Sequence, residues 1–568
     1  MPSHGVRKST RPGMAALKTR PMPRCPWPPA SRGGTTRIRF DARATGRLRD
    51  RAVPSPAVPK ESIPMPISRT PRGGIVLGFD VGTGSGKVCA LDEDGRVLGI
   101  ETEGYPTRTP RTAWAEQDPS SWLPALALAC RRLIARLELD PGRVRGLAVT
   151  SAAHVGVLLD AAGEPVRPAI LWHDQRSQTE AREIAQTAGD EVFAIGNNWP
   201  TPTWTLSHLA WMRRHDPRSL ERTRHLLLSK DYLAFRLTGE RATDPAAAVS
   251  ALLLDVATGR WSERLCALAG LSVAQLPPVR PIAAGIGRLL PEPASLLGLT
   301  AGTPVFNGTM DSTAETFSAG VRREGECVIR LASAGGIHGI SSPARVHPKL
   351  ISYPYPIAPY WLSQAGTNTC ATAVAWACSL MTGDRDAPDF EQWSALAETS
   401  PPGSNGVLFH PYLSGERCPY WDGDLRASFV GLGLDHGRAD LARSVYEGTA
   451  FALRDALSVL QDRGFALSGV RLVGGGAKSR VWSGIVASVL DCPVRAAPLA
   501  DSSAGAGLLA LVGLGVFDGP SSAPAVQTDD GDRIHEPDPG SRALYDDAFA
   551  RYRDVQRRLA EVYRRADG

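Results

Sequence analysis

The stretch from Ile75 to Asp92, IVLGFDVGTGSGKVCALD, constrains the fold of this chain more than any other part of the sequence. Two short apolar runs flank a turn rich in Gly, Thr and Ser, and this pattern predicts a β-hairpin. Gly82, Gly84 and Gly86 lie in the turn, where the lack of side chains lets backbone N–H groups face an anion at close range. We therefore interpret the hairpin as a phosphate cradle, with an ordinary surface hairpin as the alternative.

The polar residues of this hairpin add the other groups that bind a nucleotide. Lys87 supplies a cation, and Thr83 and Ser85 supply hydroxyls. Asp80, directly after the first apolar run, supplies a carboxylate that could hold Mg²⁺ through water. The sequence thus combines a phosphate cradle with a candidate metal anchor.

Two better-known phosphate-binding motifs are excluded here. A P-loop requires Gly, four residues and then Gly-Lys-Ser/Thr, but Val81 stands at the first position and Val88 follows Lys87. A dinucleotide-binding fingerprint requires a third glycine where this chain has Lys87. A nucleotide-binding hairpin remains.

The composition is that of an ordinary globular chain with a basic segment in front. With 568 residues, the chain is too long for one core and should form two or more domains. Residues 1–72 carry 16 Lys and Arg against 3 Asp and Glu, so the formal net charge of +6 hides a mildly acidic remainder. This basic tail is rich in Pro, Arg and Ser, and we expect it to be disordered; alternatively, translation begins near Met65. The charge gives no reason to expect a nucleic-acid partner.

Cysteine and apolar content indicate a cytoplasmic protein. The nine cysteines form an odd number without a C-x-x-C pair, which favours reduced thiols and argues against a disulfide framework or a zinc site. The longest apolar stretch, Ala504–Phe517, is shorter than the roughly 20 residues of a membrane-spanning helix. We predict a buried core helix there and no membrane role.

Past the tail, strand-like and helix-like patterns alternate, as in an α/β chain. Asp518–Gly540, rich in Pro, Asp and Gly, is predicted to be a loop. The predicted strands are Val144–Thr150 and Val155–Asp160, and the predicted helices are Ser177–Ala188, Ser207–His215, Asp440–Arg463 and Tyr545–Tyr563, the last with its aromatic residues in the core.

A second hairpin resembles the first. Glu326–Leu331 and Ile337–Ile340 are predicted to be strands around the small-residue turn Ala332–Gly336. One phosphate hairpin in each half of the chain suggests two duplicated lobes, with the break near Arg322–Gly325.

A third glycine-rich turn follows in the second half. Val470–Val473 is predicted to be a strand and Gly474–Gly476 a tight turn, after which Ser479 can cap a helix that begins at Arg480. The N-terminus of a helix after such a turn is a natural site for a nucleotide base, ribose or phosphate. A glycine-rich connection without a ligand is the alternative.

Seven sequence blocks, taken in order, resemble those of one family. They are GFDVGTGSGK (78–87), WAEQDPSSW (114–122), RPAILWHDQR (167–176), KDYLAFRLTG (230–239), YLSGERCPYWD (412–422), the segment 427–447 and GGGAKSRVW (474–482). The chain is similar in these blocks to the FGGY carbohydrate kinases, and within them most similar to the xylulose kinases, over nearly all of residues 74–566. The resemblance implies an α/β fold of two actin/RNase H-like lobes with the active site in the cleft between them. It gives an N-terminal lobe at 73–322, which binds the sugar and carries the catalytic Asp, and a C-terminal lobe at 323–568, which binds adenosine.

The resemblance also assigns catalytic and metal-binding residues. The stretch FNGTMDSTAETFSAG (306–320) matches the context of the family's catalytic Asp and places that role on Asp311. Phosphoryl transfer depends mainly on positioning and charge stabilisation, and one base must accept the proton of the attacking sugar hydroxyl. Asp80 is the second catalytic candidate, and both carboxylates are expected to hold Mg²⁺, through water.

For the sugar, the matching residue is His154 in SAAHVG, with its neighbour Ala153, Asp174 and Asp311 as further candidates. The chain departs from the family pattern at this point, because Ala152 and Ala153 stand where Gln and Met are usual. These replacements remove an amide and some bulk. We therefore expect a roomier and less polar sugar pocket.

For ATP, the resemblance implies contacts from all three glycine-rich turns. The second hairpin departs from the family's GTSG, since it has the sequence Ala-Ser-Ala-Gly at 332–335, and His208 replaces a family Lys. The expected ATP- and phosphate-binding residues are Gly82, Thr83, Gly84, Ser85, Lys87, Ser333, Gly335, Gly474, Gly475, Gly476, Ala477 and Lys478.

The leading interpretation is an ATP- and Mg²⁺-dependent kinase of a ketopentose, with D-xylulose, converted to D-xylulose 5-phosphate, as the best single substrate. Ribulose, erythritol-type polyols and an autoinducer-like hydroxyketone are alternatives within the family. Outside it, the chain could be an actin-like ATPase without sugar transfer. A non-catalytic sugar-binding regulator would require loss of Asp311 or Asp80, and both are present. The expected partner is a small-molecule sugar, and a homodimer would be ordinary.

Overall fold

The computed structural model describes residues 73–382, 388–526 and 533–565. The chain divides into two units, residues 1–60 and 61–568, and all described residues belong to the second. The basic tail at 1–72, expected to be disordered, lies outside the described residues.

A six-stranded sheet organises the first half of the chain, in the order β11-β12-β5-β1-β2-β3. The predicted hairpin is confirmed as β1 and β2, which pair antiparallel, and β5 and β12 follow β1 as a parallel set. The strands are β1 (Ile75–Val81), β2 (Ser85–Asp92), β3 (Val97–Gly104), β5 (Val144–Ser151), β11 (Gly285–Arg288) and β12 (Pro304–Phe306).

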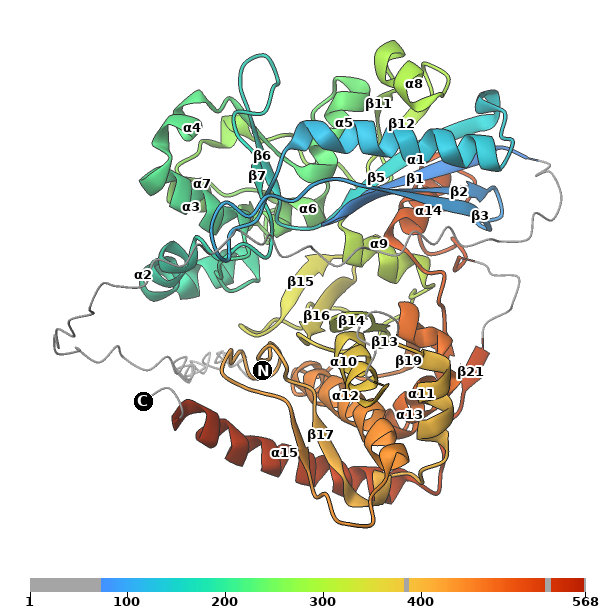
Figure 1. The fold of residues 1–568 in the computed structure, drawn as a ribbon. Coiled ribbons are helices and arrows are strands. Elements are labelled where there is room, and N and C mark those ends of the chain that lie inside the picture. Colours follow the sequence, from blue (N-terminus) through green and yellow to red (C-terminus); the bar gives the residue numbers. More distant parts are fainter. Residues whose placement is uncertain (1–72, 383–387, 527–532, 566–568) are drawn as a thin grey trace, which may run out of the picture. The chain divides into compact units, whose positions relative to one another are not determined.

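Strand β1 is buried on both faces, which explains its continuous apolar sequence. Ile75, Leu77 and Phe79 share a core with α1 (Trp122–Arg136) on one face, whereas Val76 on the other face belongs to a core with α14 (Ser502–Gly513). Figure 1 shows α1 and α14 on opposite sides of the strands.

Helix α14 confirms the buried core helix predicted for Ala504–Phe517, although it begins two residues earlier and ends at Gly513. A glycine on β1 permits its close approach, since a Cβ on Gly78 would lie 1.8 Å from the carbonyl oxygen of Ser503. The helix comes from the second half of the chain but packs on the first sheet and on α9 (Asp311–Ser318). The division into lobes at 73–322 and 323–568 therefore remains a proposal. Helix α14 lies in the second of these ranges but packs on elements of the first.

The other elements of the first half surround this sheet. The helices predicted near 177–188 and 207–215 are present as α2 and α3. The remaining elements are β4 (Glu116–Gln117), η1 (Pro119–Ser121), η2 (Pro141–Arg143), β6 (Gly156–Leu159), β7 (Ala169–Ile170), α2 (Gln178–Gly196), α3 (Thr205–His215), α4 (Pro217–Arg222), β8 (His225–Leu228), α5 (Ser229–Thr238), α6 (Pro245–Ser250), β9 (Leu254–Asp255), β10 (Arg260–Trp261), α7 (Glu263–Ala269), η3 (Val273–Gln275) and α8 (Pro291–Leu297).

A seven-stranded sheet organises the second half, in the order β15-β16-β14-β13-β19-β20-β21. The predicted second hairpin is confirmed as β13 and β14, which continue antiparallel into β16, while β19 pairs parallel to β13. This is the pattern of β1, β2, β3 and β5, and it is the structural form of the suspected duplication. The strands are β13 (Glu326–Leu331), β14 (Gly335–Ser341), β15 (Ile351–Pro354), β16 (Trp361–Gly366), β19 (Gly469–Val473), β20 (Val494–Ala496) and β21 (Arg533–His535).

Strand β21 corrects one prediction. The stretch Asp518–Gly540 was expected to be a loop, but Arg533–His535 pairs antiparallel with β20. Three residues carry too little pattern to be recognised as a strand, and pairing at a sheet edge is a tertiary effect. The other elements of the second half are α10 (Ala371–Thr382), α11 (Phe390–Glu398), η4 (Ser404–Gly406), β17 (Leu408–His410), β18 (Ser428–Val430), α12 (Arg438–Gln461), η5 (Gly475–Lys478), α13 (Arg480–Leu490) and α15 (Arg542–Arg565).

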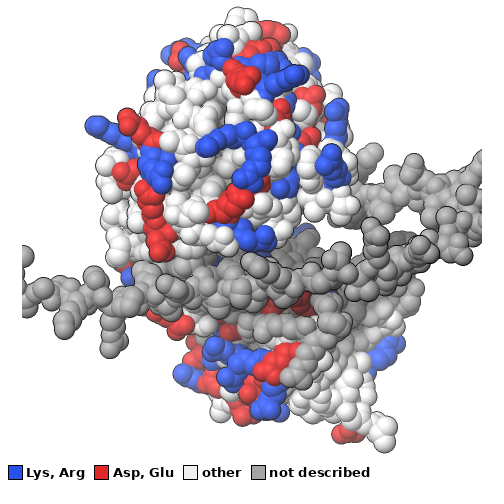
Figure 2. Space-filling model, turned by 90° about the vertical axis from the view of Figure 1, so that its left-hand side faces the viewer, with Lys and Arg blue, Asp and Glu red and all other residues white. Residues whose placement is uncertain are grey.

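The described surface carries charges of both signs. On the face shown in Figure 2, Lys and Arg are interspersed with Asp and Glu over the described parts. Within the described ranges, no helix is both long enough and apolar enough to span a bilayer.

Candidate active site

The three candidate residues of the first half meet at one edge of the first sheet. Strands β1, β5 and β12 run parallel, and Asp80, His154 and Asp311 lie at or just beyond their carboxyl ends. A bridge between Ser151 and Met310 brings the two following segments side by side. The carboxyl ends of parallel strands are where α/β proteins place ligands, so this edge is the candidate active site.

The turn of the first hairpin is held from outside. The hydroxyl of Tyr105 donates to the carbonyl of Gly82 at 2.5 Å, and Gln117 Nε2 donates to the carbonyl of Thr83 at 2.6 Å. Trp172 Nε1 donates to Thr83 Oγ1 at 3.0 Å. No atom lies within 4 Å of the Cβ position at Gly84. The turn is therefore held by side chains from three other segments and is open at Gly84, where a phosphate could approach.

Asp80 has one free oxygen. Ser502 at the start of α14 donates to its Oδ2 at 2.8 Å, whereas the buried Oδ1 has no hydrogen-bond partner. Burial raises the pKa of Asp80 to about 7, against the charge of Lys87 and with help from Asp501 and Asp311. A buried carboxylate with an unpartnered oxygen suits a divalent cation, so the residues present fit Mg²⁺.

The metal would not be held by protein alone. Within the described residues, no group of three or more His, Cys, Asp or Glu side chains is arranged to hold an ion. Mg²⁺ commonly keeps several waters and binds through one or two carboxylates and phosphate oxygens. Contact through water from Asp80 and Asp311 stays a prediction.

Lys87 lies opposite Asp80 in the hairpin register but pairs with a residue of the second half. Its Nζ lies 2.6 Å from Asp501 Oδ2, the residue that caps α14. The charge of Asp501 raises the pKa of Lys87 above its ordinary value, and burial opposes this shift. A charged lysine is thus kept beside the open turn.

Asp311 is the first residue of α9. Its Oδ1 accepts a hydrogen bond from the backbone N–H of Ser312 at 2.7 Å. Burial raises the pKa of Asp311, while that hydrogen bond and the charges of Arg330 and Lys87 lower it. A carboxylate with a raised pKa is a stronger proton acceptor than an ordinary aspartate.

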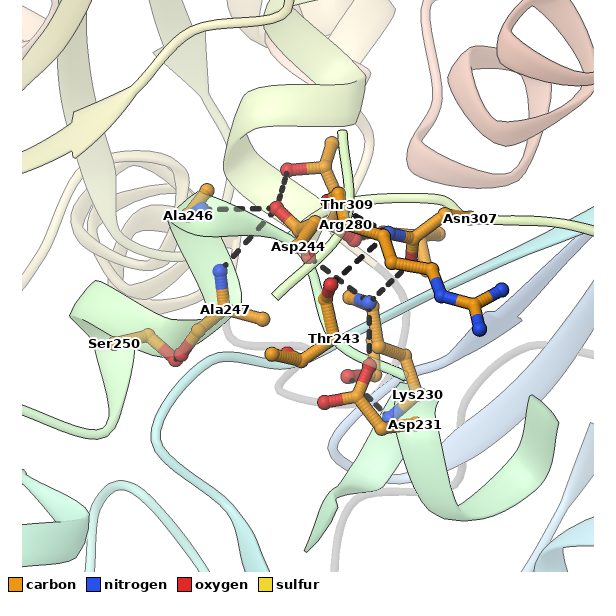
Figure 3. A network of polar contacts seen from close by, with 12 residues as sticks. Lys230, Asp231, Thr243, Asp244, Ala246, Ala247, Ser250, Arg280, Asn307 and Thr309 are labelled. Atoms are coloured by element: carbon orange, nitrogen blue, oxygen red, sulfur yellow. Dashed lines mark hydrogen bonds and ion pairs between the residues drawn. The ribbon is translucent and has the colours of Figure 1, made fainter. Parts of the chain in front are cut away.

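A buried ionic network holds the segment that leads to Asp311 (Figure 3). Lys230 Nζ lies 2.5 Å from Asp231 and 2.9 Å from Asp244. It also donates to the side-chain oxygen of Asn307 at 3.1 Å, while Thr309 donates to Asp244 at 3.1 Å. The segment 307–309 is thus fixed by one lysine and one aspartate just before Asp311.

The charges of this network depend on each other. Lys230 is only 2% exposed. Burial disfavours its ammonium, but the carboxylates of Asp231 and Asp244 raise its pKa above the ordinary value. Burial raises the pKa of Asp231, which Lys230 counteracts. The lysine must therefore remain charged for the two buried carboxylates to be tolerated.

His154 is fully engaged by protein partners. Its φ of 67° is left-handed, which is uncommon for a residue other than glycine. Its Nδ1 lies 2.8 Å from the carbonyl oxygen of Ser250, and its Nε2 lies 2.9 Å from the hydroxyl of Tyr353. Burial lowers the pKa of His154 to about 4, so the ring is neutral at neutral pH.

The two alanines that distinguish this chain border different cores. Ala153 packs at the border of a buried cluster that contains Tyr353 of β15, whereas Ala152 belongs to the core that includes β1 and α1. A roomier and less polar sugar pocket stays a prediction.

The structure gives Asp174 a structural role. The carboxylate is fully buried and forms two hydrogen bonds with the guanidinium of Arg176, at 2.9 and 2.7 Å. It also accepts hydrogen bonds from the backbone N–H groups of Ala115 and Arg176, at 2.6 and 2.8 Å. With four bonds to protein, Asp174 is not available to a sugar hydroxyl, contrary to the expectation.

The other two glycine turns lie next to each other. Because β13 and β19 are parallel, their carboxyl ends meet, and a Cβ on Gly474 would lie 2.8 Å from the carbonyl oxygen of Leu331. No atom lies within 4 Å of the Cβ position at Gly475, and Ser479 caps α13 as predicted, through the backbone N–H of Trp482. These turns place Gly475 and the exposed Ser333 and Lys478 around one open edge, whereas the side chain of Ala477 is buried.

Gly335 differs from the expectation. Its N–H donates to Thr367 Oγ1 at 3.0 Å and is not free for a phosphate. A Cβ at this position would lie 2.5 Å from the same oxygen. The glycine therefore serves the close packing of β14 on the segment after β16.

Comparison with known proteins decides the family. The chain matches the N-terminal domain of the FGGY family of carbohydrate kinases over residues 75–318 and the C-terminal domain over residues 334–514. The chain belongs to this family. It is 32% identical to the xylulose kinase of Escherichia coli K12 over 415 residues, which are 73% of this chain and 84% of that protein. A solved xylulose kinase from Brucella ovis has a TM-score of 0.79 and 31% identity, and the match covers 86% of this chain and all of that one.

Membership in the FGGY family fixes the class of reaction and the fold. This FGGY kinase is a sugar kinase that uses ATP, and it has the family's two actin/RNase H-like lobes. The gluconokinase of Bacillus subtilis is also similar, at 26% identity over 454 residues, 78% of this chain and 88% of that protein. Kinases of different sugar substrates are thus related to this chain.

Some residues at this edge were not found from the sequence. Glu315 lies one helical turn after Asp311 on α9, 3.6 Å from Arg330, and burial raises its pKa. Nothing in the sequence indicated that Tyr353 has a function, because no motif of a binding or catalytic site lies near it. Trp172 and Lys230 lie in blocks that resemble the family, and this was their only signal.

Proposed function

We propose that this FGGY kinase phosphorylates a ketopentose, best D-xylulose to D-xylulose 5-phosphate, with Asp311 as the general base. The observation that carries the proposal is the position of Asp311, at the start of α9 and beside the hairpin that bears Asp80 and Lys87. Similarity to several xylulose kinases supports the choice of sugar.

In this proposal each side chain has a defined task. Asp311 accepts the proton of the sugar hydroxyl that attacks the γ-phosphorus, so that the oxygen becomes nucleophilic as the new P–O bond forms and the bond to ADP breaks. Its burial supports the task, because a raised pKa strengthens the base. Lys87 and the open turn at Gly84 face the phosphates. Asp80 and Asp311 would hold Mg²⁺ through water, and the ion would neutralise charge on the β- and γ-phosphates.

The direct test is ADP release with a panel of ketopentoses, polyols, hexoses and gluconate, followed by identification of the phosphorylated product. We expect ADP release to depend on sugar, with D-xylulose at the highest kcat/KM. ADP release that does not change with any sugar would favour an ATPase without sugar transfer. A preference for another substrate would leave the enzyme class intact and change only the sugar.

A further inference from the structure

A tyrosine from the second half of the chain reaches the candidate sugar site. Tyr353 belongs to β15, the edge strand of the second sheet, yet it is only 1% exposed. Its hydroxyl lies 2.9 Å from His154 Nε2, although the two residues are 199 positions apart. His154, the candidate sugar-binding residue of the first half, is therefore covered by the side chain of Tyr353 from the second sheet.

The hydrogen bonds of His154 determine which polar atoms of His154 and Tyr353 remain available to a sugar hydroxyl. A carbonyl oxygen can only accept, so Nδ1–H of His154 donates to Ser250, and Nε2 is an acceptor. Tyr353 must then donate its hydroxyl hydrogen to Nε2. Both ring nitrogens are used, but the hydroxyl oxygen of Tyr353 keeps acceptor capacity. A sugar hydroxyl can donate to Tyr353 without breaking any bond of His154.

The position of Tyr353 is fixed by its neighbours. The side chain of Asn198 accepts from Ser352 N at 2.8 Å and donates to Ser352 O at 2.9 Å, which docks β15 on the first half. Gln364 on the adjacent β16 donates to the hydroxyl of Ser312, next to Asp311, at 2.7 Å. Burial, with a smaller contribution from the charge of Asp311, raises the pKa of Tyr353, so the phenol stays protonated.

We propose that Tyr353 is a specificity-determining residue whose hydroxyl oxygen accepts a hydrogen bond from one hydroxyl of the sugar, and that His154 is a positioning residue acting through it. This inference rests on the proposed function and deepens it. It predicts a polyhydroxylated acceptor with a hydroxyl, other than the phosphorylated one, directed at β15. It also makes the acceptor site a product of both halves of the chain, since Asn198 and Ser352 must be joined to form it.

The first experiment compares Tyr353→Phe with Tyr355→Phe. Tyr355 is a matched control, because it is also buried but its hydroxyl donates to the backbone of Val321 at 2.9 Å, away from His154. Substrates are the best sugar and its analogues that each lack one hydroxyl. We expect the wild type and Tyr355→Phe to disfavour one analogue by about 10- to 100-fold in kcat/KM, the range of a hydrogen bond to a buried group. Tyr353→Phe should use that analogue and the parent sugar equally well, and its Tm should fall no further than that of Tyr355→Phe, which also loses one buried hydrogen bond.

A double-variant cycle separates the roles of Tyr353 and His154. If His154 acts through Tyr353, His154→Ala raises the KM for sugar in the wild type but by less than about twofold in Tyr353→Phe. If His154 contacts the sugar directly, its replacement has the same effect in both backgrounds, and Tyr353→Phe alone keeps the selectivity of the wild type. The second result overturns the inference.

Binding of the same sugars without ATP, measured by calorimetry, distinguishes this inference from the proposed function. Binding that depends on the Tyr353 hydroxyl, in a protein that transfers no phosphate, supports the inference and contradicts the proposed reaction. Sugar phosphorylation with the selectivity unchanged in Tyr353→Phe supports the reaction and overturns the inference. A protein that neither binds nor phosphorylates any sugar of the panel overturns both.

Discussion

At the scale of single residues, the proposed function assigns different tasks to two buried carboxylates. Asp80 and Asp311 both have raised pKa values because burial disfavours their charged forms. A raised pKa would make Asp311 the stronger base that the proposed function requires. Asp80 also has an unpartnered oxygen, Oδ1, which a cation can satisfy.

Replacing Asp311 by Asn should lower kcat for sugar phosphorylation by about 10²- to 10⁴-fold, the usual cost of losing a general base. An amide keeps the shape of the site and can still accept from Ser312 N, so Tm and the Kd for ATP should stay near those of the wild type. Single-turnover kinetics and ATP titration measure both. A kcat within about threefold of the wild type, far short of that range, would remove Asp311 from the base role.

The pH dependence of kcat/KM for ATP should follow the ionisation of the Asp80 carboxyl group. Its pKa is raised to about 7, so the carboxylate is protonated below this pH and ionised above it. Only the ionised form attracts Mg²⁺, and kcat/KM for ATP should therefore fall as the pH drops through about 7. Higher Mg²⁺ concentrations favour the ionised form and should move this fall to lower pH. An acid limb that does not shift with Mg²⁺, or that persists in Asp80→Asn, would contradict the assignment.

At the scale of elements, two connections hold the catalytic segments in place. Helix α14 ties to the first hairpin through Lys87 and Asp501 at its N-terminus. The segment before α9 is tied to Lys230 and Asp244 by the buried network. The connection through Lys230 acts by position, whereas Lys87 of the first connection also faces the phosphates in the proposed function.

Replacing Lys230 by Met should lower the free energy of unfolding by about 3–5 kcal/mol, because it leaves Asp231 and Asp244 buried without their partner. Adding Asp231→Asn should recover part of this loss, since one of the uncompensated charges is removed. Chemical denaturation measures the effect, and Lys349→Met, which removes an exposed lysine, is the control. If Lys230→Met is as stable as Lys349→Met, the network does not hold the segment.

At the scale of the whole molecule, the described body contains both sheets and a shared core. Leu508 and Leu511 of α14 belong to a buried cluster with Val76 of the first sheet and Val328 of the second. The body therefore depends on elements of both halves of the chain, and Gly78 allows the close contact of β1 with α14.

A chain that begins at Met65 keeps every element that the structure describes. We expect its Tm and kcat to match those of the full chain, measured by thermal unfolding and sugar-dependent ADP release. A shortened chain that unfolds at lower temperature would show that residues 1–64 contribute to the folded body, against the interpretation of the basic tail.

Local patterns in the sequence were enough to predict many of the elements and to suggest several candidate site residues. The apolar runs around the glycine turn predicted β1 and β2, and the Ser479 cap predicted the start of α13, because such signals act within a few residues. Similar reasoning made Asp80 and Lys87 candidates, whereas Asp311 became a candidate through the family resemblance; the structure brings all three to the same edge of the first sheet. The class of enzyme followed from the ordered blocks.

Only the tertiary structure decided which side chains are free to bind. Asp174 is occupied by Arg176 and the N–H of Ala115, and Tyr353 arrives at His154 from 199 residues away. These outcomes depend on packing between distant elements, for which a sequence has no local signal. Periodicity and turn chemistry thus determined the elements of this kinase, whereas long-range packing determined the partners of its buried polar groups.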